Sequence, residues 1–129
     1  DFEIDKKFRK SKNWKWLELS REAKWISLEK AIKANINIAV GTDAGFMLPH
    51  GSMNYREIEY LIQGGMSNIQ AIKSATRIGG ELLQMNVGTI QIGQKADLLV
   101  VNGNPIEDIK VLSDKTNIKV FKDGELIIN

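Results

Sequence analysis

The sequence predicts an α/β protein with a helix–strand–helix–helix portion over residues 1–86 and a β-rich tail over residues 87–129. Two observations predict this division. Up to residue 86, apolar side chains recur at helical spacing around one short β-branched run. Beyond residue 87, short apolar runs alternate with turn residues, which is typical of antiparallel strands. The 129 residues suit a single domain that buries a core.

A first helix is expected from Ser20, a favourable N-cap residue, to a stop at Asn35. Glu22 lies in its first turn, where the helix dipole favours an anion. The apolar residues Trp25, Leu28 and Ile32 follow at helical spacing. Residues 36–40 (Ile-Asn-Ile-Ala-Val) then predict a buried strand. A loop over residues 41–54 follows it.

Three further helical segments are expected before the tail. The first contains Tyr55, Ile58, Leu61 and Ile62 and ends at Gly64-Gly65. Ser67 and Gln70 form a capping-box pattern that predicts the next helix. Residues 82–85 suggest one more turn. In the tail, strands are expected over residues 89–92, 97–102, 118–122 and 125–128, the last two joined by the hairpin signal Asp123-Gly124.

Composition excludes several classes of site. The chain has no Cys and one His, so it cannot build a thiol site or a multi-histidine metal site alone. Its 18 basic and 16 acidic residues leave a net charge of +2, too small to imply a nucleic-acid or membrane partner. The basic residues concentrate at the start together with aromatics, a pattern open to two readings: a nucleic-acid groove or a surface segment packed on the fold. No Walker A loop, Gly-x-Gly-x-x-Gly motif or nucleophile elbow is present.

Asp43 is the first candidate for chemistry because it follows the predicted strand between two glycines. Such strand ends are rigid, and a carboxylate there suits a divalent cation or accepts a proton from water. The same pattern also fits a turn former or an N-cap. His50, the only imidazole, lies on the same predicted loop. It is either a site residue or an exposed polar side chain.

Several motifs together resemble the later part of a metal-dependent amidohydrolase. They are Gly-Thr-Asp-Ala-Gly (41–45), Pro-His-Gly-Ser-Met-Asn (49–54) with Glu57, Gly-Met-Ser (65–67) with Ala71 and Ala75-Thr76, the run at 88–101, Asn104-Pro105 and residues 120–124. The pattern is most similar to imidazolonepropionase-like and Xaa-Pro dipeptidase-like members. Residues 1–86 would then be the last strand and flanking helices of a TIM barrel, and residues 87–129 strands of the small β-sandwich.

The resemblance implies hydrolysis of C–N bonds in a small amide, cyclic amide or dipeptide-like molecule. Asp43 would bind a divalent metal, expected to be zinc, and handle the hydrolytic water. His50 would contact the substrate. The family's His-x-His pair, bridging residue and later histidines are absent from these 129 residues.

The sequence therefore predicts that the isolated chain is inactive and holds no tightly bound metal. Its partner would be the missing N-terminal portion or a second copy, and the alternative function is a non-catalytic oligomerisation module. No signal-peptide pattern or long apolar run is evident, so a cytoplasmic location is expected.

Overall fold

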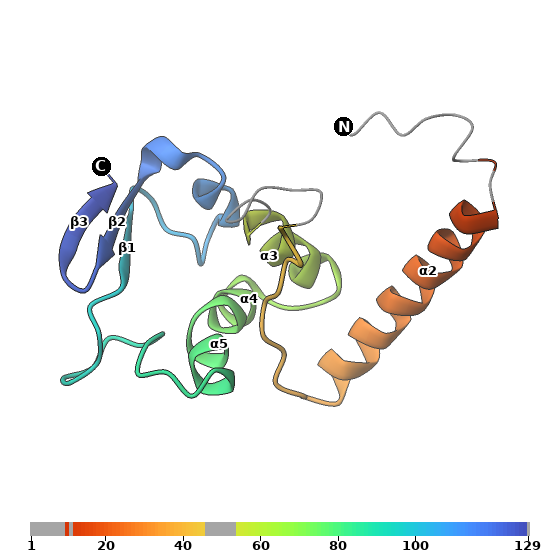
Figure 1. Cartoon of the computed structure of the whole chain (residues 1–129), viewed down its shortest axis with the longest axis horizontal. Helices are drawn as coiled ribbons and strands as arrows, with labels where there is room; N and C mark the ends of the chain where they lie inside the picture. The colour runs from red at the N-terminus through yellow and green to blue at the C-terminus, as the bar shows by residue number, and fades with distance from the viewer. Residues whose placement is uncertain (1–9, 11, 46–53, 129) are drawn as a thin grey trace. The chain divides into compact units, whose positions relative to one another are not determined.

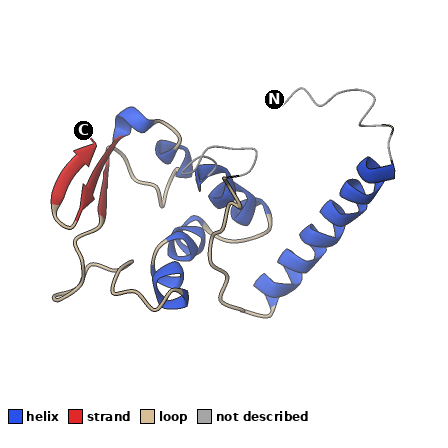
Figure 2. Ribbon diagram, viewed as in Figure 1, coloured by secondary structure: helices blue, strands red, loops and turns tan. Residues whose placement is uncertain are grey.

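The computed structural model describes residues 10, 12–45 and 54–128. The chain forms two compact units, residues 1–36 and residues 37–129. Figure 2 shows that helices dominate up to α5 and that the strands all follow it. Within the described ranges, no helix combines the length and apolar character needed to cross a membrane.

The first unit contains one helix, α2 (Lys12–Lys33). It begins before Ser20, so the predicted start is wrong: the Ser20 hydroxyl donates to the Leu17 carbonyl inside the helix instead of capping it. The predicted stop is confirmed. Asn35 has φ 54°, and the amides of Asn35 and Ile36 donate to the Ile32 and Ala31 carbonyls, which is a Schellman ending.

The second unit begins with an extended segment and three helices, α3 (Asn54–Gln63), α4 (Asn68–Ala75) and α5 (Arg77–Leu82). The predicted capping box is confirmed: Ser67 Oγ accepts from the Gln70 amide, and Gln70 Oε1 accepts from the Ser67 amide at 2.8 Å. Ile58 and Leu61 from α3 and Ala71 from α4 are the buried apolar side chains of the described residues. Helix α3 therefore packs on α4 through a small core.

The helical turn expected over residues 82–85 is wrong in position. Helix α5 begins earlier, at Arg77, and includes Gly79 and Gly80. Gly80 is buried, and a Cβ there would lie 2.5 Å from the Val87 carbonyl oxygen. The bare glycine lets the chain after α5 fold back against the helix. The expected helical residues Leu82 and Leu83 are 70% and 68% exposed.

An antiparallel sheet of three strands, in the order β1-β2-β3, closes the unit (Figure 1). Its strands are β1 (Leu98–Val101), β2 (Ile118–Lys122) and β3 (Glu125–Ile128), which confirms three of the four strands predicted in the tail. Asp123 and Gly124 have φ 50° and 87°, as the predicted two-residue hairpin requires. Two short 3₁₀ helices, η1 (Ile109–Leu112) and η2 (Lys115–Asn117), join β1 to β2.

Two predicted strands are wrong. Residues 36–40 are extended but pair with no strand of the described chain. A buried parallel strand needs neighbouring strands on both edges, and the described chain supplies none here. Residues 89–92 form a loop closed on itself: the amide and hydroxyl of Thr89 both donate to Gln94 Oε1. The side chains of Ile90 and Ile92 are 89% and 107% exposed, so they do not pack against a sheet.

The domain boundary predicted at residue 86 concerns the barrel and sandwich of a complete protein, and it stays a prediction. In this chain, α3 to α5 and the sheet belong to the same compact unit.

Two glycines allow a controlled test of backbone packing. Gly88 and Gly93 have φ 91° and 88°, but a Cβ on Gly88 would lie 2.5 Å from the Thr76 carbonyl oxygen, whereas one on Gly93 meets nothing within 4 Å. We expect Gly93→Ala to cost about 1–2 kcal/mol from backbone strain. Gly88→Ala should cost a further ~1–3 kcal/mol because the Thr76 backbone must move. Urea unfolding measures both, and equal losses would contradict the close contact.

Asp97 ties the start of β1 to the hairpin turn, since its carboxylate accepts from Lys122 Nζ at 2.6 Å and from the Asp123 amide at 2.9 Å. The Lys122 hydrogen bond and then the Asp123 amide lower the pKa of Asp97. The folded state therefore binds this proton less tightly than the unfolded state. The resulting stability is present above the unfolded pKa and is lost as pH falls through the folded pKa.

We accordingly expect Asp97→Asn to lower the free energy of unfolding at pH 7. The difference from wild type should shrink below about pH 4, where an ordinary Asp takes up its proton. Urea titrations across that range test this. Glu125→Gln, at an exposed β3 carboxylate with no described ion pair, is the control and should leave the acid dependence unchanged.

Candidate active-site segment

The candidate site lies in the segment 37–45, which is extended up to the turn that contains Asp43. Helix α4 holds this segment through Ser74. The Ser74 hydroxyl donates to the Ile38 carbonyl at 2.5 Å, and the Val40 amide donates to the Ser74 carbonyl at 3.2 Å. The segment is thus anchored three residues before Asp43.

Asp43 lies in an exposed turn and has a positive φ of 50°. Asp tolerates this left-handed conformation better than most residues. The turn is stabilised locally, because the Ala44 amide donates to Thr42 Oγ1 at 3.2 Å, and Gly45 follows with φ 131°. The Asp43 side chain is exposed in the described chain, which fits both a metal ligand and a turn former.

His50 lies outside the described residues, so its expected contact with the substrate stays a prediction. Over residues 12–45 and 54–128, no three His, Cys, Asp or Glu side chains group as a metal site would need. A zinc centre takes about four ligands. The described residues therefore do not fit a metal by themselves, and Asp43 would be one ligand among others supplied from elsewhere.

The first turns of α3 hold ionisable groups in a partly apolar setting. Burial, reinforced by the hydrogen bond that Tyr55 Oη donates to Glu59 Oε1 at 2.7 Å, raises the pKa of Tyr55 to about 12. Burial also raises the pKa of Glu57, which is half-buried. Tyr55 consequently stays a neutral hydrogen-bond donor at any physiological pH.

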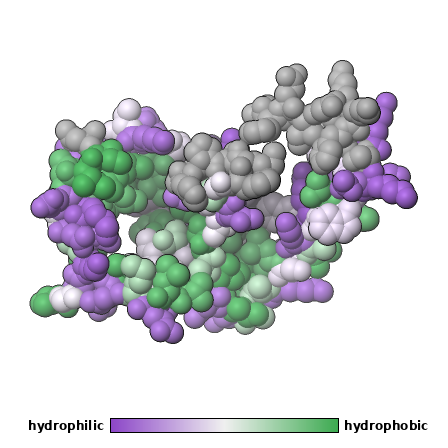
Figure 3. Space-filling view, viewed as in Figure 1, coloured by the Kyte–Doolittle hydropathy of each residue, from purple (hydrophilic) through white to green (hydrophobic). Residues whose placement is uncertain are grey.

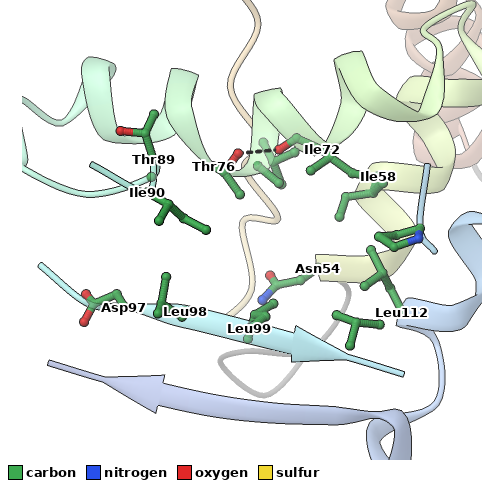
Figure 4. A pocket seen from close by; sticks show the side chains of 15 residues that line it. Asn54, Ile58, Ile72, Thr76, Thr89, Ile90, Asp97, Leu98, Leu99 and Leu112 are labelled. Carbon is green, nitrogen blue, oxygen red and sulfur yellow. Dashed lines mark hydrogen bonds between the residues drawn. The ribbon is translucent and has the colours of Figure 1, made fainter. Parts of the chain in front are cut away.

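A cavity of about 690 Å³ lies between the helices and the sheet. Figure 4 shows Ile58, Ile72 and Thr76 pointing into it from the helices, opposite Leu98 and Leu99 of β1. Most of its lining is aliphatic, and Asp43 is not part of it. This cavity therefore does not coincide with the candidate carboxylate.

Sequence reasoning missed Ser74. A signal exists in the pattern: Ser74 lies three residues after Ala71, on the side of α4 that faces the core, where an apolar residue is expected. Ser74 is 0% exposed. A buried hydroxyl at such a position must find a hydrogen-bond acceptor.

Comparison with known proteins decides the family. The sequence profile described as "Amidohydrolase family" matches residues 5–127, nearly the whole chain. The chain belongs to the amidohydrolase family. This confirms the resemblance seen in the motifs around Asp43 and at residues 88–101.

The amidohydrolase relatives are much longer than this chain. Ochratoxinase from Aspergillus niger is 31% identical in an alignment of 121 positions that covers 88% of this chain and 24% of that protein. Its crystal structure superposes with a TM-score of 0.82 at 30% identity, covering 93% of this chain and 28% of the ochratoxinase chain. The chain therefore spans about a quarter of the length of these relatives.

Two other amidohydrolase structures agree. A Xaa-Pro dipeptidase with methionine bound in its active site is 40% identical with a TM-score of 0.71, covering 81% of this chain and 25% of that one. A prolidase complexed with N-methylphosphonate-L-proline is 29% identical with a TM-score of 0.64, covering 81% and 26%. The fold described above, helices followed by a small antiparallel sheet, is thus part of the amidohydrolase fold.

Proposed function

We propose that this chain is the closing quarter of a metal-dependent hydrolase that cleaves C–N bonds in a small amide, cyclic amide or dipeptide-like substrate. The observation that carries the proposal is the family match over residues 5–127, together with the segment that presents Asp43. The relatives support the substrate class, since they act on small molecules such as dipeptides and ochratoxin.

Asp43 is the proposed reacting group of this chain. A carboxylate on an anchored segment accepts a proton from the attacking water and passes it to the leaving amine. Its exposure in the described chain leaves it accessible to groups from the rest of the protein. His50 is proposed to contact the substrate. The divalent metal, proposed as zinc, would need ligands beyond the described residues.

The isolated chain is expected to show no amidase or dipeptidase turnover and no stoichiometric tight zinc, because it supplies too few ligands. Zinc stoichiometry after dialysis, with turnover on a dipeptide and an acyl-amide panel, measures this. Tight binding of one zinc together with turnover that Asp43→Asn abolishes would overturn the expectation of inactivity.

A chimera tests the role of Asp43 directly. This chain replaces the matching quarter of the Xaa-Pro dipeptidase, its 40% identical relative. We expect the folded chimera to hydrolyse the dipeptide, and Asp43→Asn to lower kcat by about 10²–10⁴, the range for loss of an acid–base group. Glu125→Gln is the matched carboxylate control. A folded chimera without activity, or one that Asp43→Asn leaves active, contradicts the proposal.

The second candidate function is a non-catalytic assembly module, and exposed apolar residues on the sheet favour it. Leu99 and Val100 of β1 are 59% and 53% exposed, and Ile127 and Ile128 of β3 are 58% and 53% exposed. Hydrophobic side chains gather on the surface over the strands in Figure 3. Exposed apolar side chains mark an association surface when they form a large contiguous patch.

If this second function holds, the chain should associate as its concentration rises, with the apparent mass measured by light scattering. Ile127→Lys on the edge strand β3 should weaken that association, because a charge must then be buried. Ile26→Lys, at a 54% exposed position on α2, is the control. A monomer at every concentration would exclude the assembly function.

A further inference from the structure

Ser74 contacts the candidate segment through two different groups. Its hydroxyl donates to the Ile38 carbonyl at 2.5 Å, and its backbone carbonyl accepts from the Val40 amide at 3.2 Å. The carbonyl of residue 38 and the amide of residue 40 flank Ala39 and point to the same edge of an extended chain. We call this pair of hydrogen bonds the Ser74 bridge.

The Ser74 bridge reproduces the hydrogen bonds of a parallel strand pair. In such a pair, the amide of one residue donates to the carbonyl of the residue that precedes its neighbour on the other strand. Its carbonyl accepts from the amide of the residue that follows that neighbour. Ser74 cannot donate its own amide because that amide belongs to helix α4. The hydroxyl takes the place of the amide as donor.

The end of α4 supplies the acceptor. The last four carbonyls of a helix lack partners inside it. Helix α4 ends at Ala75, and Thr76, with φ −124° and ψ −93°, interrupts the helical conformation before α5 begins. This break leaves the Ser74 carbonyl available to the Val40 amide.

The bridge is sheltered and specific. Ser74 is 0% exposed, so water does not compete for its hydroxyl. The Ser74 hydroxyl also lies 3.7 Å from Met66 Sδ, a weak acceptor.

We propose that Ser74 is a positioning residue that fixes the register of residues 38–40 and thereby places Asp43. A slip of one residue turns every side chain of an extended segment to the opposite face. Asp43 follows the bridged residues at once, so its carboxylate would move with them. The inference deepens the proposed function, because it matters for catalysis only if Asp43 reacts; the bridge itself is independent of that role.

Amide hydrogen exchange of the full 129-residue chain, followed by NMR, tests the bridge. We expect Ser74→Ala to speed exchange of the Val40 amide about tenfold, since it removes one hydrogen bond and leaves the part-buried Ile38 carbonyl without this donor. The Ala71 amide, bonded to the Ser67 carbonyl at 3.0 Å, should keep its wild-type rate. Unchanged exchange at Val40, or the same acceleration at both amides, overturns the proposal.

Two variants separate the hydroxyl from general packing. Ser74→Thr retains the hydroxyl and should restore Val40 protection to within about threefold of wild type. Ser113→Ala removes an exposed hydroxyl that donates to the Lys110 carbonyl at 2.7 Å and should change neither amide. A Ser74→Thr chain with wild-type stability and an unprotected Val40 amide contradicts the bridge.

A measurement on the unmodified chain covers the case in which Ser74→Ala does not fold. The scalar coupling across the hydrogen bond between the Val40 nitrogen and the Ser74 carbonyl carbon should be detectable. Its absence in a chain with resolved resonances at both residues overturns the proposal. In the dipeptidase chimera, activity that survives Asp43→Asn defeats the proposed function but leaves these exchange results standing.

Discussion

The interruption of the helix between α4 and α5 at Thr76 positions three segments that are far apart in the sequence. The Ser74 carbonyl just before it accepts from Val40, and the Thr76 carbonyl receives the close approach of Gly88. Gly80 just after it packs against Val87. Without the break, continuous helical hydrogen bonding would occupy the Ser74 carbonyl. The Thr76 carbonyl accepts from the Gly80 amide at 2.9 Å. The extended segment, helices α4 and α5 and the loop before β1 therefore all meet at the short stretch of backbone around Thr76.

Local signals in the sequence predicted the local structure. The capping box at Ser67, the ending at Asn35 and the hairpin at Asp123-Gly124 depend on contacts between residues close in the chain, and the structure confirms all three. The wrong predictions concern elements whose state depends on distant partners. Residues 36–40 have the composition of a buried strand, yet no neighbouring strand is available to them in the described chain.

The same distinction applies to the candidate site. The sequence placed Asp43 in a loop directly after a buried strand, and the structure has the exposed loop position but no strand before it. The anchoring by Ser74 was not predictable, because it joins residues 36 positions apart through a serine that a sequence reading assigns to a helix. A helical serine carries no sign of its partner until the helix packs.

The hairpin also has a kinetic consequence. Strands β2 and β3 are joined by two residues with the backbone conformation that the turn requires, so they can pair within about 1–10 μs. Strand β1 must close a loop that contains η1 and η2 before it adds to β2, and that closure is slower. We therefore expect the Asp97–Lys122 contact to form after the hairpin. Interactions formed late in folding chiefly set the unfolding rate, so loss of this ion pair is expected to speed unfolding of the sheet more than it slows its formation.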